Sequence, residues 1–107
     1  MSYDISLSEE SGVCEVEQHE EGGTYVLVGT TNADLNVTYN YSSHFPFRDL
    51  NGKTAKGTIP MLKKAVEELG TERDEDYWKA TEGNAGYACN ILLNWARQHP
   101  QAVWKVI

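Results

Sequence analysis

The sequence predicts an α+β fold in which an N-terminal antiparallel sheet of three or four strands is packed on one face by two C-terminal helices. Apolar and polar residues alternate over much of the first 42 positions, which is typical of half-buried strands. After residue 57, apolar residues recur every three or four positions, which is typical of amphipathic helices. Each apolar surface needs the other for its burial, so the other face of the sheet is expected to be polar and acidic.

A length of 107 residues suits a single domain, 1–107, within which three parts follow one another. Residues 1–42 form an acidic, strand-rich part, residues 43–57 form a loop, and residues 58–107 form a helical part with a short C-terminal tail. Asn51-Gly52 is a strong turn signal and supports the loop.

The first strand is predicted from the alternation of Tyr3, Ile5 and Leu7 with polar residues. Residues 8–12 then form a turn, and residues 13–18 return as a second strand that is apolar on one face only. Short connections of this kind favour an antiparallel meander.

Two further strands are predicted in the same part. Residues 24–28 are apolar and rich in β-branched side chains, which favours a central strand. Residues 35–41 show the clearest alternation in the chain and predict a half-buried strand. The apolar positions of this last strand are Leu35, Val37, Tyr39 and Tyr41.

Two helices are predicted in the C-terminal part. The first has Thr58 as its N-cap, Pro60 in its first turn and Gly70 at its C-terminal end. The second is capped by Thr81 and ended by Pro100. Its apolar stripe consists of Ala85, Ala88, Cys89, Leu92, Leu93 and Ala96.

The tail at residues 102–107 is apolar and is expected to be an edge strand or an extended segment on the core. Trp78 and Trp104 lie near the ends of predicted elements, where half-exposure is expected. Trp95 lies one position from the centre of the helix stripe and is expected at its border.

The acidic charge is concentrated in the first half of the chain. The sequence has 16 acidic and 9 basic residues and a net charge of −7. Its first base is Arg48, so residues 1–47 carry eight acids and a charge of −8, whereas the remainder carries +1. This balance disfavours direct contact with nucleic acid or a membrane and favours a partner protein with a basic surface.

The cysteines and the hydropathy pattern give no catalytic or membrane signal. No secretory signal and no apolar stretch of membrane-spanning length is found, so we expect a cytoplasmic location in a bacterial host cell and reduced thiols. Cys89 is expected to be a core thiol. Cys14 with His19 or His44 imitates a nucleophile and its base, but no oxyanion element accompanies them, so we predict no enzyme and no cofactor.

Glu15, Glu17, His19 and Glu21 share parity, so an extended strand places them on one face. Such a face is a solvated acidic surface, a contact patch for a partner protein, or a site for a divalent metal. A single histidine with three carboxylates on the rim of a meander does not indicate a preorganised site, so no metal ion is expected.

Asn36, Thr38 and Asn40 occupy the polar face of the strand predicted over 35–41. This row is either the hydrated face of a sheet or a recognition ladder, because side-chain amides and hydroxyls bind ligands or a partner's backbone without a charge cost.

Five segments resemble a family of small uncharacterised proteins encoded by phages and prophages of Gram-positive gut bacteria. They are residues 22–25 (GGTY), 29–42 (GTTNADLNVTYNYS), 58–62 (TIPML), 76–85 (DYWKATEGNA) and 100–104 (PQAVW). The resemblance implies a phage context, but the family has no assigned chemistry, so no catalytic residue carries over. Residues 42–57 are shorter here than in the family pattern, which puts any role of that loop in doubt.

We therefore expect a non-enzymatic acidic phage or prophage accessory protein that binds and inhibits a host protein. A nucleic-acid-handling defence factor is the expected target, which makes the protein anti-CRISPR-like or otherwise anti-defence. The alternative is a small-ligand or nucleotide-signal binding protein, a sponge that uses the polar face of the 35–41 strand.

Overall fold

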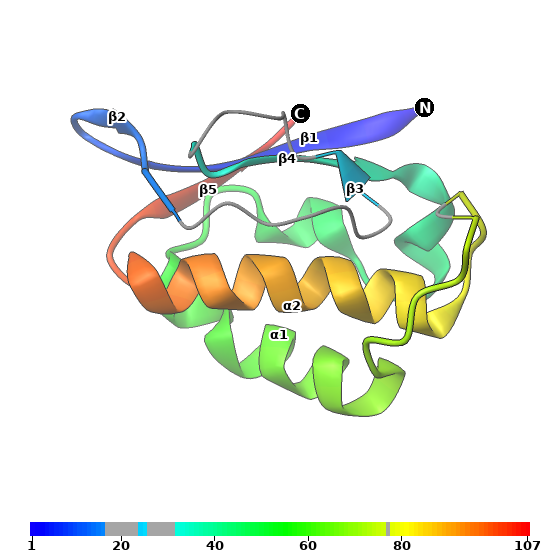
Figure 1. The fold of residues 1–107 in the computed structure, drawn as a ribbon. Coiled ribbons are helices and arrows are strands. Elements are labelled where there is room, and N and C mark those ends of the chain that lie inside the picture. Colours follow the sequence, from blue (N-terminus) through cyan, green and yellow to red (C-terminus); the bar gives the residue numbers. More distant parts are fainter. Residues whose placement is uncertain (17–23, 26–31, 77) are drawn as a thin grey trace.

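The structure, a computed structural model, describes residues 1–16, 24–25, 32–76 and 78–107. An antiparallel sheet and two C-terminal helices confirm the predicted α+β fold (Figure 1). The strands are β1 (Ser2–Glu9), β2 (Gly12–Val13), β3 (Thr24–Tyr25), β4 (Asp34–Thr38) and β5 (Val103–Val106). The helices are η1 (Tyr39–Ser43) and η2 (Phe47–Leu50), both 3-10, and α1 (Ala55–Leu69) and α2 (Glu82–Gln98).

β1 is the centre of the sheet, and its neighbours are all antiparallel to it. The strand order is β2-β1-β4-β3, and β5 also pairs with β1. Both β4 and β5 pair with Ile5 and Ser6, so they must lie on opposite edges of β1. The C-terminal tail is therefore a strand of the same sheet as the N-terminus, as Figure 1 shows.

The free edge of β5 is covered by the loop that precedes α1. The Gly52 amide donates to the Trp104 carbonyl (2.8 Å), and the Trp104 amide donates to the Lys53 carbonyl (2.9 Å). The side-chain oxygen of Asn51 accepts from the Val106 amide (3.0 Å). These hydrogen bonds satisfy backbone groups of β5 that would otherwise be open to pairing with another chain.

The helices lie on one side of the sheet, with α2 between the sheet and α1 (Figure 1). This middle position explains why α2 is buried beyond its predicted stripe, with Ile91 and Trp95 also inside. Two glycines of α2 let the backbone of the segment between α1 and α2 lie directly against the helix. A Cβ atom on Gly83 would lie 1.7 Å from the Glu72 carbonyl oxygen. One on Gly86 would lie 1.8 Å from the Gly70 carbonyl oxygen.

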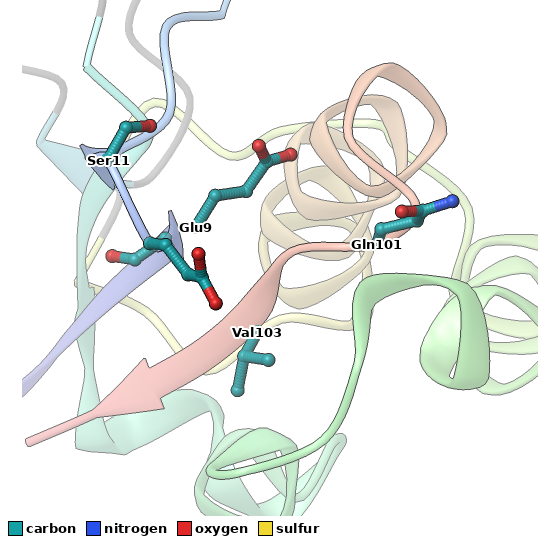
Figure 2. A pocket seen from close by; sticks show the side chains of 6 residues that line it. Glu9, Ser11, Gln101 and Val103 are labelled. Carbon is teal, nitrogen blue, oxygen red and sulfur yellow. The ribbon is translucent and has the colours of Figure 1, made fainter.

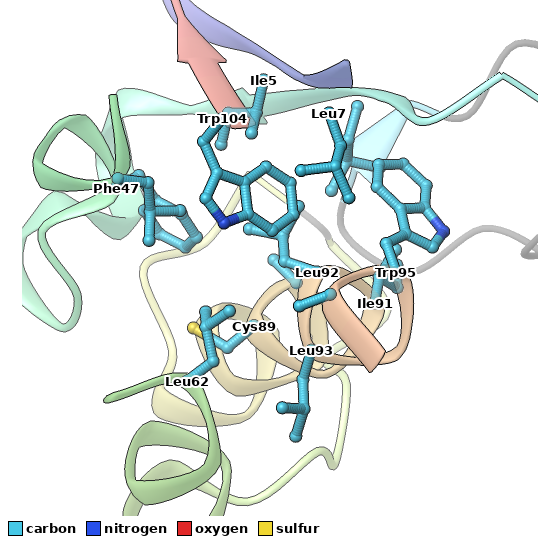
Figure 3. Close-up of a cluster of buried hydrophobic side chains, with 14 of the residues drawn as sticks. Ile5, Leu7, Phe47, Leu62, Cys89, Ile91, Leu92, Leu93, Trp95 and Trp104 are labelled. Carbon is cyan, nitrogen blue, oxygen red and sulfur yellow. The ribbon is translucent and has the colours of Figure 1, made fainter. Parts of the chain in front are cut away.

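The core is built around two tryptophans, Trp95 of α2 and Trp104 of β5 (Figure 3). The Trp104 indole nitrogen donates to Thr58 Oγ1 of α1 (2.8 Å), and that hydroxyl donates to the Ala55 carbonyl (2.8 Å). The predicted half-exposure of Trp104 is wrong, because pairing of the tail with β1 turns this side chain inward. Trp95 is also fully buried rather than at a border, whereas Trp78 is half-exposed as predicted.

The helix ends are partly as predicted. Gly70 ends α1 with φ 73°, and Thr81 caps α2 by accepting from the Asn84 amide, which confirms both positions. The predicted N-cap Thr58 is wrong, because α1 begins at Ala55 and Thr54 accepts from the Gly57 amide. Thr58 is buried one turn later, where its hydroxyl accepts the hydrogen bond from the Trp104 indole.

The strand predicted over 35–41 is too long. β4 ends at Thr38, whose hydroxyl accepts from the Asn40 amide (3.3 Å) and so caps the 3-10 helix η1. This turn brings Tyr41 fully into the core, whereas Tyr39 is exposed. Burial of Tyr41 is achieved here by a turn of helix rather than by strand alternation.

Over its described part, residues 13–16, the strand predicted over 13–18 is not continuous. β2 ends at Val13, and Glu15 forms an isolated bridge with Asn32. Of the strand predicted over 24–28, the described part is β3, since residues 17–23 and 26–31 lie outside the described residues. No helix in the described part of the chain is long and apolar enough to span a bilayer.

Candidate functional site

The face of the sheet that points away from the helices carries carboxylates. Ile5 and Leu35 are fully buried on the inner side, so their neighbours along each strand point outward. Asp4 pairs with Asn36 across β1 and β4, and the Asn36 amide donates to Asp4 Oδ1 (2.9 Å). Asp34 lies on the same strand face as Asn36, two residues away. The expected polar and acidic sheet face is therefore present.

The negative charge of Asp4 acts on the carboxyl group of Asp34. Partial burial raises the pKa of the Asp34 carboxyl, and the negative charge of Asp4 raises it further. A cationic group placed over this face would relieve that repulsion.

Two exposed valines lie on the same side of the sheet, near the β1–β2 turn. Val13 and Val103 are both register partners of Ser8, on opposite edges of β1. Their exposed fractions are 45% and 42%. Lys105 adds a base, opposite Ser6. We call this surface the outer face, and define it by Asp4, Ser6, Ser8, Val13, Asp34, Asn36, Val103 and Lys105.

The predicted row of Asn36, Thr38 and Asn40 is not formed. Asn36 is on the outer face, but Thr38 is buried with 4% of its surface exposed. Asn40 belongs to η1, and its side-chain amide donates to the Trp78 carbonyl (2.8 Å). The three side chains separate because the strand ends at Thr38 and the backbone turns into a 3-10 helix.

Of the predicted acidic row, Glu15 is described and exposed, whereas Glu17, His19 and Glu21 lie outside the described residues. The backbone carbonyl of Glu15 is bonded to Nε2 of His99, 2.5 Å away. Because a carbonyl oxygen only accepts, Nε2 is the protonated nitrogen of this ring. This contact connects the segment after β2 with the end of α2.

Beside Glu15, the structure brings together Glu9, Cys14 and His99, which we call the corner cluster. One carboxylate oxygen, the thiol sulfur and one ring nitrogen all lie within 4.8 Å of one another. His99 Nδ1 is 3.8 Å from Glu9 Oε1. Cys14 is buried, with 7% of its surface exposed, whereas Glu9 is exposed.

Local structure explains why these three residues meet. Ser8 pairs with Val13, so Cys14 lies opposite Leu7 and diagonal to Glu9 on the inner face. Pro100 disfavours helical backbone at the residue before it, and His99 has the non-helical angles φ −132° and ψ 67°. The backbone therefore turns away from the helix at His99, and its ring lies beside Glu9 and Cys14 at the corner of the sheet.

An open depression of about 660 Å³ adjoins the corner cluster. Figure 2 shows it between the β1–β2 turn and the segment that leads into β5, with the Glu9 side chain directed toward the end of α2. Its lining residues are Ser8, Glu9, Glu10, Ser11, Gln101 and Val103.

The thiols are poorly suited to nucleophilic catalysis. Burial raises the pKa of Cys14, and the negative charge of Glu9 raises it further, while a backbone hydrogen bond from Glu9 acts in the opposite direction. Burial raises the pKa of Cys89 to about 12. A reactive cysteine needs a lowered pKa, so the proximity of His99 to Cys14 does not make a catalytic pair.

Sequence reasoning missed the corner cluster, because it tested Cys14 against His19 and His44. The His44 ring is bonded to the Ala80 carbonyl (2.7 Å). The sequence signal that could have indicated His99 was its position directly before Pro100, where the second helix is expected to end and the tail to begin. In comparisons with known proteins, no family model, no curated protein and no solved structure matches this chain.

Proposed function

We propose that the protein is a non-enzymatic binding protein that docks through its outer face onto a basic surface of a host protein. The observation that carries this proposal is the composition of that face, which combines Asp4 and Asp34 with the exposed side chains of Val13 and Val103. Interfaces between proteins join apolar contact at their centre with polar and charged groups around it. The outer face offers both.

The charge distribution supports a basic partner. All eight acids of residues 1–47 belong to the part of the chain that forms β1 to β4, where no lysine or arginine occurs. Lys105 of β5 is the base on the outer face. Complementary charge attracts a partner over a distance and raises the association rate, chiefly at low ionic strength.

A nucleic-acid-handling protein of a bacterial host is the partner class that we propose. Its nucleic-acid groove is basic, and an acidic domain that occupies the groove competes with the nucleic acid. The resemblance to phage proteins makes a defence nuclease the first candidate, and an anti-CRISPR-like or other anti-defence role follows from that assignment. This role requires neither a cofactor nor an active site.

The test begins with capture of a partner from a lysate of a Gram-positive gut bacterium, after which association is measured with the purified pair. Asp4→Lys and Asp34→Lys should each slow association about tenfold at low salt. Glu67→Lys, an exposed reversal on α1, is the matched control and should have little effect. Val103→Asp should weaken binding through loss of apolar contact.

Equal effects of the outer-face and α1 reversals would contradict docking through the outer face. Tighter binding at high salt would contradict a basic partner. The small-ligand alternative depended on a row of Asn36, Thr38 and Asn40, and that row is not formed, so we do not propose it.

A further inference from the structure

We propose that the corner cluster binds a zinc ion through Glu9 Oε1, Cys14 Sγ and His99 Nδ1, with a water molecule as the fourth ligand. This inference does not rest on the proposed binding function, because none of the three ligand residues belongs to the outer face. Thiolate, imidazole and carboxylate are the three side-chain ligands that zinc uses in proteins. Here one of each is brought to the same point.

The distances suit a tetrahedral ion after a small adjustment. Bonds of about 2.0–2.3 Å place neighbouring ligand atoms about 3.3–3.8 Å apart around such an ion. The separation of His99 Nδ1 from Glu9 Oε1 is 3.8 Å, and no pair in the cluster exceeds 4.8 Å. Glu9 is a long side chain with 47% of its surface exposed, so rotation about its bonds can close the remaining distance.

The hydrogen bond from His99 to Glu15 selects the ring nitrogen that faces the cluster. Nε2 donates to the Glu15 carbonyl, so Nδ1 of the neutral ring carries a lone pair. Metal-binding histidines commonly donate their second nitrogen to a carbonyl or carboxylate in this way, which orients the ring. The lone pair of Nδ1 then faces the carboxylate of Glu9, 3.8 Å away, so a cation between them would be attracted by both groups.

The surroundings also favour a cation. His99 directly follows α2, and the carbonyl groups at the end of a helix carry a partial negative charge. Cys14 provides a sulfur that is shielded from solvent, whereas Glu9 borders the open depression of Figure 2. The ion would be enclosed on the sulfur side and open to water on the carboxylate side, as in a site with three protein ligands.

Binding would connect three segments that are distant in the sequence. Glu9 ends β1, Cys14 follows β2, and His99 follows α2. An ion held by all three would fasten the β1–β2 turn to the end of the central helix. We therefore expect zinc to raise the melting temperature of the protein as well as to bind it.

The experiment uses the full chain, stripped of metal with a chelator and kept reduced. Addition of Co²⁺ as a spectroscopic probe should produce a thiolate-to-cobalt charge-transfer band at one equivalent. Zn²⁺ should abolish this band and should bind with a stoichiometry of one in a competition titration. Cys14→Ser should remove the band, and His99→Ala and Glu9→Gln should each weaken Zn²⁺ binding about tenfold or more.

Matched control variants come from the same chain. Cys89→Ala removes the other thiol, His44→Gln removes another histidine, and Glu10→Gln removes a carboxylate of the adjacent turn. All three should keep the cobalt band and the zinc affinity. Circular dichroism of each variant establishes that it is folded, and Glu9→Gln, on an exposed side chain, tests the site even if Cys14→Ser does not fold.

Absence of a thiolate band from the wild-type protein would overturn the proposal. Zinc affinity that is unchanged by Glu9→Gln and His99→Ala would overturn it as well. Zinc affinity that falls equally with Glu10→Gln would show adventitious binding to surface carboxylates, which also contradicts a site at the corner cluster.

Discussion

The inner face of β1 has two parts with different surroundings, the apolar pair Ile5 and Leu7 and the carboxylate Glu9. Ile5 and Leu7 are fully buried in the core (Figure 3), where Trp104 is the register partner of Leu7 and α2 lies beneath the sheet. Glu9 is the next inward position in the same alternation, yet it is exposed and lies with Cys14 and His99. The comparison shows that strand periodicity assigns a side chain to a face but does not determine its environment.

The physical difference lies in what the helix presents at each point. Under Ile5 and Leu7, α2 offers its apolar side, and burial is favourable by about 25 cal/mol per Å² of apolar surface. At Glu9, the same helix has ended, and its terminus offers a ring nitrogen instead of methyl groups. A carboxylate is tolerated there because water and polar atoms surround it.

The largest effect should come from the apolar region. Leu92→Ala and Leu62→Ala each remove a fully buried side chain and should lower the free energy of unfolding by about 2–5 kcal/mol. Urea denaturation measures this, and zinc-free Glu9→Gln provides the contrast with a change below about 0.5 kcal/mol. Losses under about 1 kcal/mol at both leucines would contradict the buried packing of the helices.

A smaller loss is expected from removal of a polar contact inside the apolar region, the hydrogen bond between Trp104 and Thr58. Thr58→Val keeps the shape of the side chain but removes the acceptor of the Trp104 indole N–H. The unsatisfied donor should cost about 1–3 kcal/mol in urea denaturation. Thr71→Val, at an exposed threonine, is the control and should be nearly neutral. Equal stability of the two variants would contradict a structural role for this hydrogen bond.

In the corner cluster, we expect the reactivity of Cys14 to depend on the charge of Glu9. In metal-free protein, alkylation of Cys14 should be slower at pH 8 than alkylation of a free thiol, because its raised pKa leaves less thiolate. Glu9→Gln removes a negative charge, so it should lower this pKa and speed the reaction. Cys89, with its pKa of about 12, should stay unreacted in the folded protein. A slower reaction in Glu9→Gln would contradict the electrostatic influence of Glu9.

The smallest effect is expected on the outer face. The pKa of Asp34 is raised by folding, so the native state holds its proton more tightly and stability falls as pH rises through this ionisation. Asp34→Asn should therefore be slightly more stable than wild type at pH 7, and this gain should vanish below pH of about 3.9, the unfolded pKa. Thermal denaturation at both pH values measures it. A loss of stability of Asp34→Asn at pH 7 would contradict a raised pKa of Asp34 in the folded protein.

Several elements could be predicted because their signals are local. The alternation of Ile5 and Leu7 identified the first strand, and Gly70 and Thr81 identified helix ends, since each depends on neighbouring backbone groups. The capping residue of α1 was misplaced because both Thr54 and Thr58 satisfy the local rule. The choice between them depends on Trp104, a residue that is remote in the sequence.

The candidate sites were less predictable. The acidic character of the outer face followed from composition and parity, but its exposed valines depended on strand register. The row from Asn36 to Asn40 was lost because β4 ends at Thr38, whose side chain caps a 3-10 helix. The corner cluster was missed because its members are joined only by the pairing of β1 with β2 and by the point at which α2 ends.

By itself, the sequence determined the α+β class, the order of its elements and the concentration of acids in the first half of the chain. These properties arise from hydrophobic periodicity and from composition, which require no long-range contact. Only the tertiary structure decided that the tail joins β1 as a strand, and that His99 meets Glu9 and Cys14. Such contacts depend on how whole elements pack, because residues far apart in the chain become neighbours only when the common core is buried.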